Sequence, residues 1–234
     1  MRSVDNQHGV PRRLGYAEQP MVHETTQTDD LSLTGQYVRL EPMDVHHAEG
    51  LADAAGNDAL LYQWSPVPLN VSDARRYIQT ALAWKQAGTA LPFVIVRLTD
   101  GNVIGSTRLW NIEYWSWPEG HANYGRGLPD ACEIGYSWLA RSAIRTAANT
   151  EAKKLLLEHA FESWRVLRVC LHTDVRNVRS RAAIERIGGK FEGILRAHRM
   201  AADYTPRDSA RYSILASEWP AVKERLTERL VRSC

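Results

Sequence analysis

A short bend of small and hydroxyl side chains is the stretch of this sequence whose residue types best fit a chemical role. It runs from Ser142 to Glu151 with the letters SAIRTAANTE, and it joins a strand-like run, CEIGYSWLA, to a helix-like run, AKKLLLEHAFESW. The first amides of a helix lack intrahelical partners and lie at the positive end of the helix dipole, so small residues there let an anion approach closely. Arg145 adds a full positive charge. The bend therefore indicates an anion site, with an ordinary turn capped by Asn149 or Thr150 as the alternative.

Other groups that often do chemistry show no organised spacing. The bend lacks the Gly-Lys-Ser/Thr and GxGxxG patterns, which argues against a Walker loop and a dinucleotide fingerprint. His46 and His47 have no further ligands at metal spacing, and the three cysteines are unpaired in pattern, so neither a metal site nor a disulfide framework is expected. The formal net charge of +2 gives no strong field toward nucleic acid, and no apolar run approaches the ~20 residues that a bilayer requires. We expect a cytoplasmic protein with no metal, nucleic-acid or membrane partner.

The elements that must position the bend predict a single mixed α/β domain. Residues 1–33 are polar and aperiodic, so they are expected to form a flexible N-terminal tail, and residues 34–234 the domain. Asp100-Gly101 predicts the turn of a hairpin, and residues 113–130 predict a long aromatic loop. Strands are expected at 36–43, at 91–112 as a hairpin, at 131–140, at 167–175 and at 190–219 as a closing hairpin, and helices at 46–64, 71–88, 150–164, 178–189 and 221–230.

The second half of the chain resembles the GNAT acyltransferase superfamily, and within it the branch of bacterial ribosomal-protein N-terminal acetyltransferases. The resemblance is carried by EIGY from Glu133, by NTEA from Asn149, and by D-x-R-N-x-x-S-x-x-A-I-E-R-I-G from Asp174, and it covers about residues 33–220. It implies one GNAT-like domain with a mixed, mostly antiparallel sheet that is splayed at its central strands and flanked by helices. It also implies acetyl-CoA, or another acyl-CoA, as cosubstrate and a primary amine as acceptor.

The resemblance also implies which residues contact the cofactor. In the family the bend has the form Gln/Arg-x-x-Gly-x-Gly/Ala, and its amides bind the pyrophosphate of coenzyme A. This chain departs from that form at Ile144, Ala147 and Asn149, and the neighbouring Arg145 could compensate. Asn177 matches an asparagine that contacts the cofactor arm, and it could equally cap the following helix. The implied cofactor contacts are Ser137, Trp138, Leu139, Arg145, Thr146, Ala147, Ala148, Asn149, Thr150, Asn177 and Arg179.

Acyl transfer to an amine requires a base, a donor to the thioester oxygen and an acid for the departing thiolate. Glu133 matches the strand glutamate that this branch uses as base, with an edge-facing or ion-paired glutamate as the alternative. The main-chain N–H near Ser137 could polarise the thioester. Many relatives use a helix tyrosine as acid, but Ile184 stands at that position here. Ser180 matches the serine proposed instead, and a first-turn helix serine is its structural alternative.

The acceptor side is expected to be aromatic. Trp64 follows the first predicted helix, where the family has acceptor-binding residues, and the long loop brings further rings, although these could instead form a satellite core. The expected substrate-binding residues are Trp64, Trp110, Tyr114, Trp115 and His121. The acceptors left open by the sequence are a protein N-terminus, a lysine and a small molecule, and a homodimer is left open as well. The competing hypothesis is a non-catalytic module that senses acyl-CoA or binds a partner.

Overall fold

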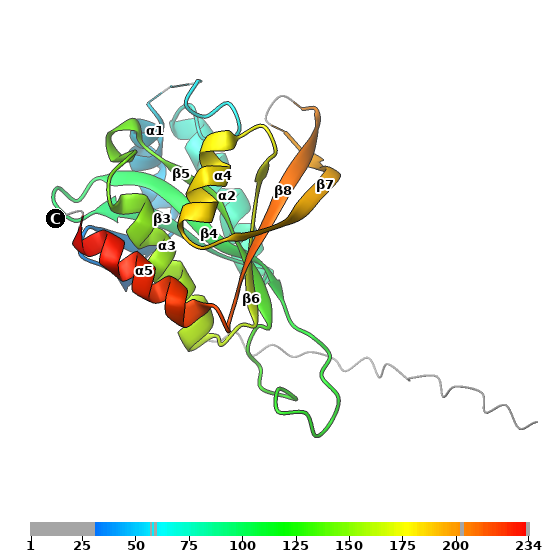
Figure 1. The fold of residues 1–234 in the computed structure, drawn as a ribbon. Helices are drawn as coiled ribbons and strands as arrows, with labels where there is room; N and C mark the ends of the chain where they lie inside the picture. The colour runs from blue at the N-terminus through cyan, green and yellow to red at the C-terminus, as the bar shows by residue number, and fades with distance from the viewer. Residues whose placement is uncertain (1–30, 57, 59, 202–203, 233–234) are drawn as a thin grey trace, which may run out of the picture.

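A computed structural model describes residues 31–56, 58, 60–201 and 204–232 (Figure 1). Residues 1–30 of the predicted tail at 1–33 lie outside the described residues. The first strand begins at Leu33. The strands are β1 (Leu33–Thr34), β2 (Val38–Pro42), β3 (Ala90–Arg97), β4 (Val103–Glu113), β5 (Ala131–Leu139), β6 (Arg168–Asp174), β7 (Lys190–Met200) and β8 (Pro206–Leu215), and the helices are α1 (Ala48–Ala55), α2 (Val71–Gln86), α3 (Ala148–Glu158), α4 (Val178–Arg186) and α5 (Trp219–Val231).

The strands form one sheet in the order β1-β2-β3-β4-β5-β6-β8-β7. Only the pairing of β5 with β6 is parallel among the described strands, so the predicted mixed, mostly antiparallel sheet is confirmed. The β3–β4 hairpin closes as predicted, because Gly101 adopts a φ of 72° that favours glycine.

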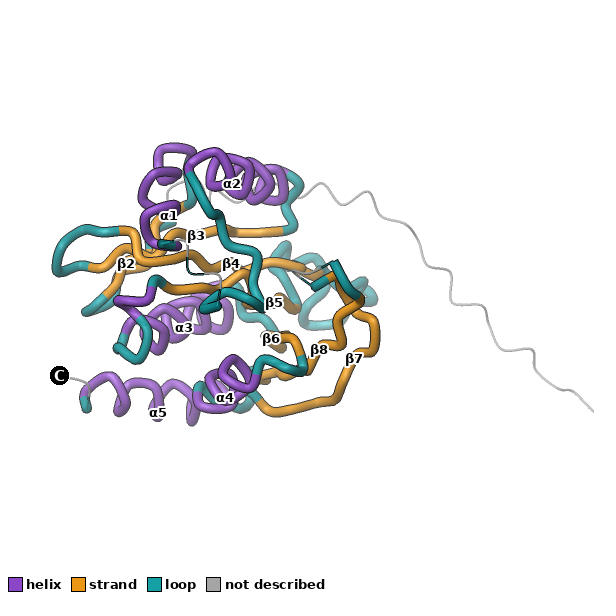
Figure 2. The backbone as a smooth tube through the Cα atoms, turned by 90° about the horizontal axis from the view of Figure 1, so that it is seen from above, coloured by secondary structure: helices purple, strands orange, loops and turns teal. Residues whose placement is uncertain are grey.

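Helices cover both faces of the sheet (Figure 2). Helices α1 and α2 lie on one face, and α3, α4 and α5 lie on the other. Nearly every residue of β3 is buried, because this central strand has a covered face on each side. Two apolar clusters result: the larger contains Leu156 and Leu226 from α3 and α5, and the smaller contains Leu51 and Ile78 from α1 and α2.

The first predicted helix, 46–64, is too long. Helix α1 ends at Ala55 because Gly56 adopts a left-handed φ of 59° and its amide bonds back to Ala52 O. The chain beyond it turns and returns toward the sheet, where Tyr62 donates a hydrogen bond to Leu139 O at 2.9 Å. This turn is what brings Trp64 to the central strands.

The central strands part midway along their length. The parallel pairing of β5 and β6 ends at Glu133 and Cys170, although β5 continues to Leu139. At the point of parting, Tyr136 has a positive φ of 51°, and the Arg108 guanidinium packs 4.4 Å from the centre of its ring. The predicted splay is confirmed, and it opens a cleft beside the second half of β5.

Glu151 ties the start of the sheet to α3. Its buried carboxylate accepts hydrogen bonds from the amides of Gln36, Tyr37 and Val38 at 2.6–2.7 Å. An interior carboxylate is tolerated when its oxygens are hydrogen-bonded in this way. The contact fixes the first turn of α3 against the β1–β2 turn, and so fixes where the bend before α3 lies.

Candidate active site

A cavity occupies the cleft between β5 and β6. It receives side chains from the turn after α1, from both parted strands, from α3 and α4, and from the β7–β8 hairpin. Its lining includes Trp64, Trp110, Glu133, Tyr136, Ser137, Trp138, Lys153, His172, Asn177, Ser180, Ile184, Arg199, Met200 and Arg207.

Seven of the residues predicted from sequence meet in this cavity, although they come from distant parts of the chain. Two are the predicted catalytic residues, three are predicted cofactor contacts and two are predicted acceptor contacts. They are Glu133, Ser180, Ser137, Trp138, Asn177, Trp64 and Trp110.

Glu133 is buried on β5 with its carboxylate beside two basic side chains. Its Oε2 lies 3.2 Å from Arg199 Nη2 and 3.0 Å from His172 Nδ1. The contact with His172 is not aligned as a hydrogen bond, so it becomes an ion pair only when the ring is protonated. Glu133 therefore lines the cavity and is ion-paired with Arg199, as its structural alternative expected.

Arg199 links this carboxylate to the aromatic wall of the cavity. Its guanidinium lies 4.2 Å from the centre of the Trp110 ring, a cation–π contact. Trp110 in turn stacks with Trp84 and meets Tyr136 edge to face, with ring centres 6.1 and 5.1 Å apart. Trp110 is thus a residue of β4 in the cavity wall, and not part of the aromatic loop.

The start of α4 lies at the opposite wall of the cavity. Asn177 caps this helix, because its side-chain oxygen accepts a hydrogen bond from Ser180 N at 3.0 Å. The cap holds Ser180 in the first turn, with its side chain at the cavity. Ile184 lines the wall one turn further on, where many relatives have a tyrosine.

Lys153 is a cavity residue that the sequence analysis did not predict. It lies on α3, is 7 % exposed, and donates hydrogen bonds to Ser137 Oγ and to Thr107 Oγ1, the latter at 3.3 Å. Burial lowers the pKa of its ammonium from 10.5 to about 7. A signal was available: Lys153 precedes Leu156 and Leu157 by three and four residues, so it shares the buried face of the helix.

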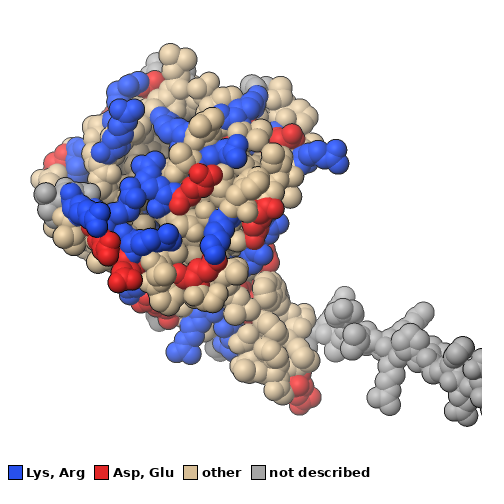
Figure 3. Space-filling view, in the orientation of Figure 1, with Lys and Arg blue, Asp and Glu red and all other residues tan. Residues whose placement is uncertain are grey.

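The bend before α3 has the free amides that an anion site requires. The helix begins at Ala148 with Ala147 as its N-cap, so neither Asn149 nor Thr150 caps it, and Thr146 Oγ1 accepts the Ala148 amide at 3.2 Å. Within the described residues, the amides of Ala147, Asn149 and Thr150 donate no hydrogen bond. Arg145 is exposed and has a left-handed φ of 63°. Figure 3 shows Lys and Arg side chains gathered over the face that carries α3 and α5.

Eleven predicted site residues lie outside the cavity lining, and six of them are residues 145–150 of the bend before α3. In the aromatic loop, the Trp115 amide and Trp117 Nε1 both donate to Asp130, and Trp117 stacks on the His121 ring at 4.2 Å. The loop therefore packs on itself, and it extends away from the sheet (Figure 1). Arg179 donates instead to Leu61 O at 3.0 Å. Besides the bend, the residues outside the lining are Tyr114, Trp115, His121, Leu139 and Arg179.

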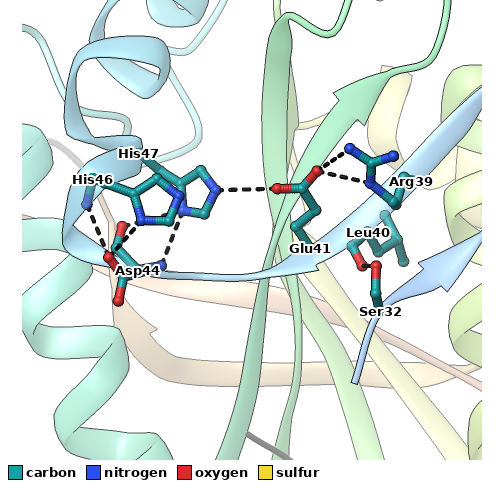
Figure 4. Close-up of polar contacts among 7 residues, drawn as sticks. All are labelled: Ser32, Arg39, Leu40, Glu41, Asp44, His46 and His47. Carbon is teal, nitrogen blue, oxygen red and sulfur yellow. Dashed lines mark hydrogen bonds and ion pairs between the residues drawn. The ribbon is translucent and has the colours of Figure 1, made fainter. Parts of the chain in front are cut away.

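The neighbouring histidines near the start of the domain serve local structure (Figure 4). The Asp44 side chain accepts the His46 amide, and the ring of His47 accepts the Asp44 amide, which together form a capping box. His47 Nε2 also lies 3.4 Å from Glu41 Oε2. In the described residues no group of three or more His, Cys, Asp or Glu side chains is placed to hold a metal ion. In the same residues no helix is long and apolar enough to cross a bilayer.

Comparisons with known proteins agree with this geometry. The family described as acetyltransferase (GNAT) domain matches residues 38–190. A Bacillus subtilis protein named "Putative ribosomal N-acetyltransferase YdaF" is 30 % identical over 187 residues, which cover 79 % of this chain and 92 % of that protein. The crystal structure of a GCN5-related N-acetyltransferase from Brucella melitensis is 27 % identical, with a TM-score of 0.73 over 86 % of this chain and 85 % of that one.

A third comparison bears on the fold. The structure of Mycobacterium smegmatis RimJ in complex with CoA-disulfide has a TM-score of 0.67 and 24 % identity, and the match covers 82 % of this chain and 88 % of that one. At this identity the match shows a shared fold. It extends the agreement to a protein whose structure holds a coenzyme A derivative.

Proposed function

The chain belongs to the GNAT acetyltransferase family and is an acyl-CoA-dependent acetyltransferase, and on that premise we propose that Glu133 and Ser180 carry out direct transfer to a primary amine. Both substrates would be bound at once, with Glu133 as base and Ser180 as acid. The single observation that supports these roles is that β5 and α4 bring the two side chains to one cavity beside the parted strands.

Glu133 suits the role of base because its carboxylate is buried at the cavity and both of its close basic partners contact the same oxygen, Oε2. Arg199 contacts only one of its oxygens, through a nitrogen 3.2 Å away. The carboxylate can therefore accept a proton from an incoming ammonium, directly or through a water molecule, while Arg199 keeps it oriented. The neutral amine that results is the nucleophile.

The residues along the cleft fit acyl-CoA. The unpaired amides of Ala147, Asn149 and Thr150 would hold the diphosphate, since helix N-terminal amides bind such anions. The parted β5 would pair with the pantetheine arm at Ser137 and Trp138, and Asn177 lies across the cleft from them. The bound cosubstrate supplies a thioester whose carbonyl carbon accepts the amine.

Two groups of this chain would stabilise the negative charge that develops on the thioester oxygen and on the departing sulfur during transfer. The main-chain N–H near Ser137 is proposed to stabilise the oxygen of the tetrahedral intermediate. The Ser180 hydroxyl would pass a proton to the departing sulfur, through water if needed, since a serine is a poor acid on its own. Ile184 cannot do this, which leaves Ser180 as the cavity hydroxyl on α4.

The acceptor class is a finer part of the proposal. The Bacillus subtilis relative is named a ribosomal N-acetyltransferase, so the N-terminal amine of a protein is the first acceptor to test, followed by lysine and small amines. The aromatic residues Trp64 and Trp110 would form walls for the acceptor.

The test is thiol release from acetyl-CoA in the presence of a panel of amines. Wild type should release thiol only when an amine is present, and Glu133→Gln should lower that rate by about a hundredfold or more. Glu113→Gln on neighbouring β4, where the side chain is exposed, is the matched control and should leave the rate unchanged. Ser180→Ala should reduce release less severely, because water can replace a hydroxyl relay.

Two results would contradict the proposal. Acetyl-CoA that raises the melting temperature without any amine-dependent release would indicate a sensing module rather than catalysis. Full activity of Glu133→Gln would remove Glu133 from the role of base while leaving the family's activity intact.

A further inference from the structure

Two arginines in the lining of the cavity are paired across the β7–β8 hairpin. Arg199 on β7 and Arg207 on β8 are direct partners in the antiparallel ladder, and both line the cavity that contains Glu133. The β7–β8 hairpin stands beyond β6 at the edge of the sheet (Figure 1). Like charges placed directly opposite each other in a ladder destabilise it, so this pair needs compensation.

The charge of Arg199 is compensated within the protein. Its guanidinium contacts the Glu133 carboxylate at 3.2 Å and stacks on Trp110 at 4.2 Å. These contacts use the edge and the face of the guanidinium. Arg199 therefore has partners before any substrate binds.

The charge of Arg207 is not compensated in the same way. Its Nε donates to the neutral Ser209 hydroxyl at 3.1 Å, and no carboxylate of the described residues lies within ion-pair distance of it. The nearby Asp174 carboxylate is engaged on both oxygens by Arg176, at 2.9 and 2.7 Å. Burial and the neighbouring Arg199 lower the pKa of Arg207, which reflects the cost of holding this cation here.

The charges around the cavity are unequal. Its lining contains three cationic side chains, Lys153, Arg199 and Arg207, but Glu133 is its one carboxylate among the described residues. Arg207 is partly buried, so solvent screens it incompletely. The two terminal nitrogens of a guanidinium match the two oxygens of a carboxylate.

We propose that Arg207, together with Arg199, binds a carboxylate carried by the acceptor, so that the preferred acceptors are amines with a carboxylate close to the amino group. This inference rests on the proposed function, because it assigns the amine to Glu133 and the carboxylate to the arginine pair a short distance away. An amino acid and a peptide whose first residues are acidic share this chemistry.

The experiment compares acceptors that differ only in this charge. Thiol release is measured with an amino acid against its amide, and with a peptide that begins with aspartate against one that begins with asparagine. Wild type should favour each carboxylate form by about tenfold or more in kcat/KM, mainly through KM. The first pair tests free amino acids, and the second tests peptide N-termini. A preference in either pair supports the inference, and no preference in both pairs overturns it.

Variants separate recognition from folding. Arg207→Met should abolish the preference between the charged and uncharged acceptors, and Arg207→Lys should retain part of it because a charge without the planar fork remains. Arg196→Met removes an exposed arginine from the same hairpin and should keep the full preference. Removal of a partly buried cation that has no carboxylate partner among the described residues should also leave Arg207→Met at least as stable as wild type without ligand, and a loss of stability would contradict this account of Arg207.

A second readout does not depend on turnover. Succinate, used as a dicarboxylate probe, should raise the melting temperature of wild type and of Arg196→Met but not of Arg207→Met. If no amine releases thiol while succinate still stabilises through Arg207, the proposed function fails and the anion site stands. If amines are acetylated equally with and without a carboxylate, the proposed function stands and the inference fails.

Discussion

Replacement of Lys153 by methionine gives the sharpest test of the physical reasoning, because it predicts a gain in stability that depends on pH. Lys153 is buried with two hydroxyls as its hydrogen-bond partners, Ser137 and Thr107. Those hydroxyls also bond to each other at 2.7 Å, so methionine leaves neither without a partner. An unbranched methionine follows nearly the same path as the lysine stem. The substitution therefore removes mainly the cost of burying a charge.

The size of this cost follows from the pKa of Lys153, which is lowered from 10.5 to about 7. Unfolding lets the amine take up a proton between these two values, so the unfolded chain binds more protons there and the stability of the native chain rises with pH. Below pH 7 the buried charge of Lys153 lowers the free energy of unfolding by its full amount, about 5 kcal/mol. Above pH 10.5 this loss of stability disappears. At pH 7, where the native amine is half protonated, it is still about 4 kcal/mol.

Urea denaturation at pH 7 and pH 9 measures this difference. Lys153→Met should exceed wild type in free energy of unfolding by about 4 kcal/mol at pH 7 and by about 2 kcal/mol at pH 9. The adjacent Lys154 pairs with Glu158 at 2.7 Å, so Lys154→Met is the control and should change stability equally at both pH values. A difference between Lys153→Met and wild type that did not vary with pH would refute the reasoning, as would a loss of stability at pH 7.

Three further predictions concern the framework. Glu151→Gln should lower the free energy of unfolding by about 2–4 kcal/mol in urea denaturation, because the carboxylate accepts three amides and a carboxamide cannot accept them all. Gly35→Ala should also destabilise, since a Cβ there would overlap the Glu151 carboxylate, and the two changes combined should cost less than their sum; simple additivity would contradict this contact. Cys132 should resist thiol reagents in the native chain and react on unfolding, because burial raises its pKa; rapid labelling of the native protein would count against this burial.

Most of the fold could be predicted from the sequence because local signals and tertiary packing agree. The hairpin at Asp100-Gly101 follows from turn chemistry, and the structure has it. The helix predicted at 178–189 is α4, which ends at Arg186, two residues before Gly188 adopts a φ of 103°. The predicted helix at 46–64 is too long, because the left-handed conformation of Gly56 ends α1 at Ala55. Glycine within an apolar helical pattern is ambiguous until its φ is known.

The candidate site was predictable only in part. The residues that lie in ordered motifs, such as Glu133 and Ser180, were found, and both line the cavity. Arg199 and Arg207 were missed because their position depends on the register between β7 and β8 and on how that hairpin meets the cleft, neither of which sequence spacing fixes. Lys153 was missed although its place on the apolar face of α3 could be read from the sequence.

The measurement that tests the central claim most directly is a structure of the protein with coenzyme A bound. The account predicts diphosphate oxygens within hydrogen-bond distance of the amides of Ala147, Asn149 and Thr150, with the thiol end in the cavity between Glu133 and Ser180. A nucleotide bound elsewhere, or amides at this bend that bond within the protein while coenzyme A is present, would contradict it.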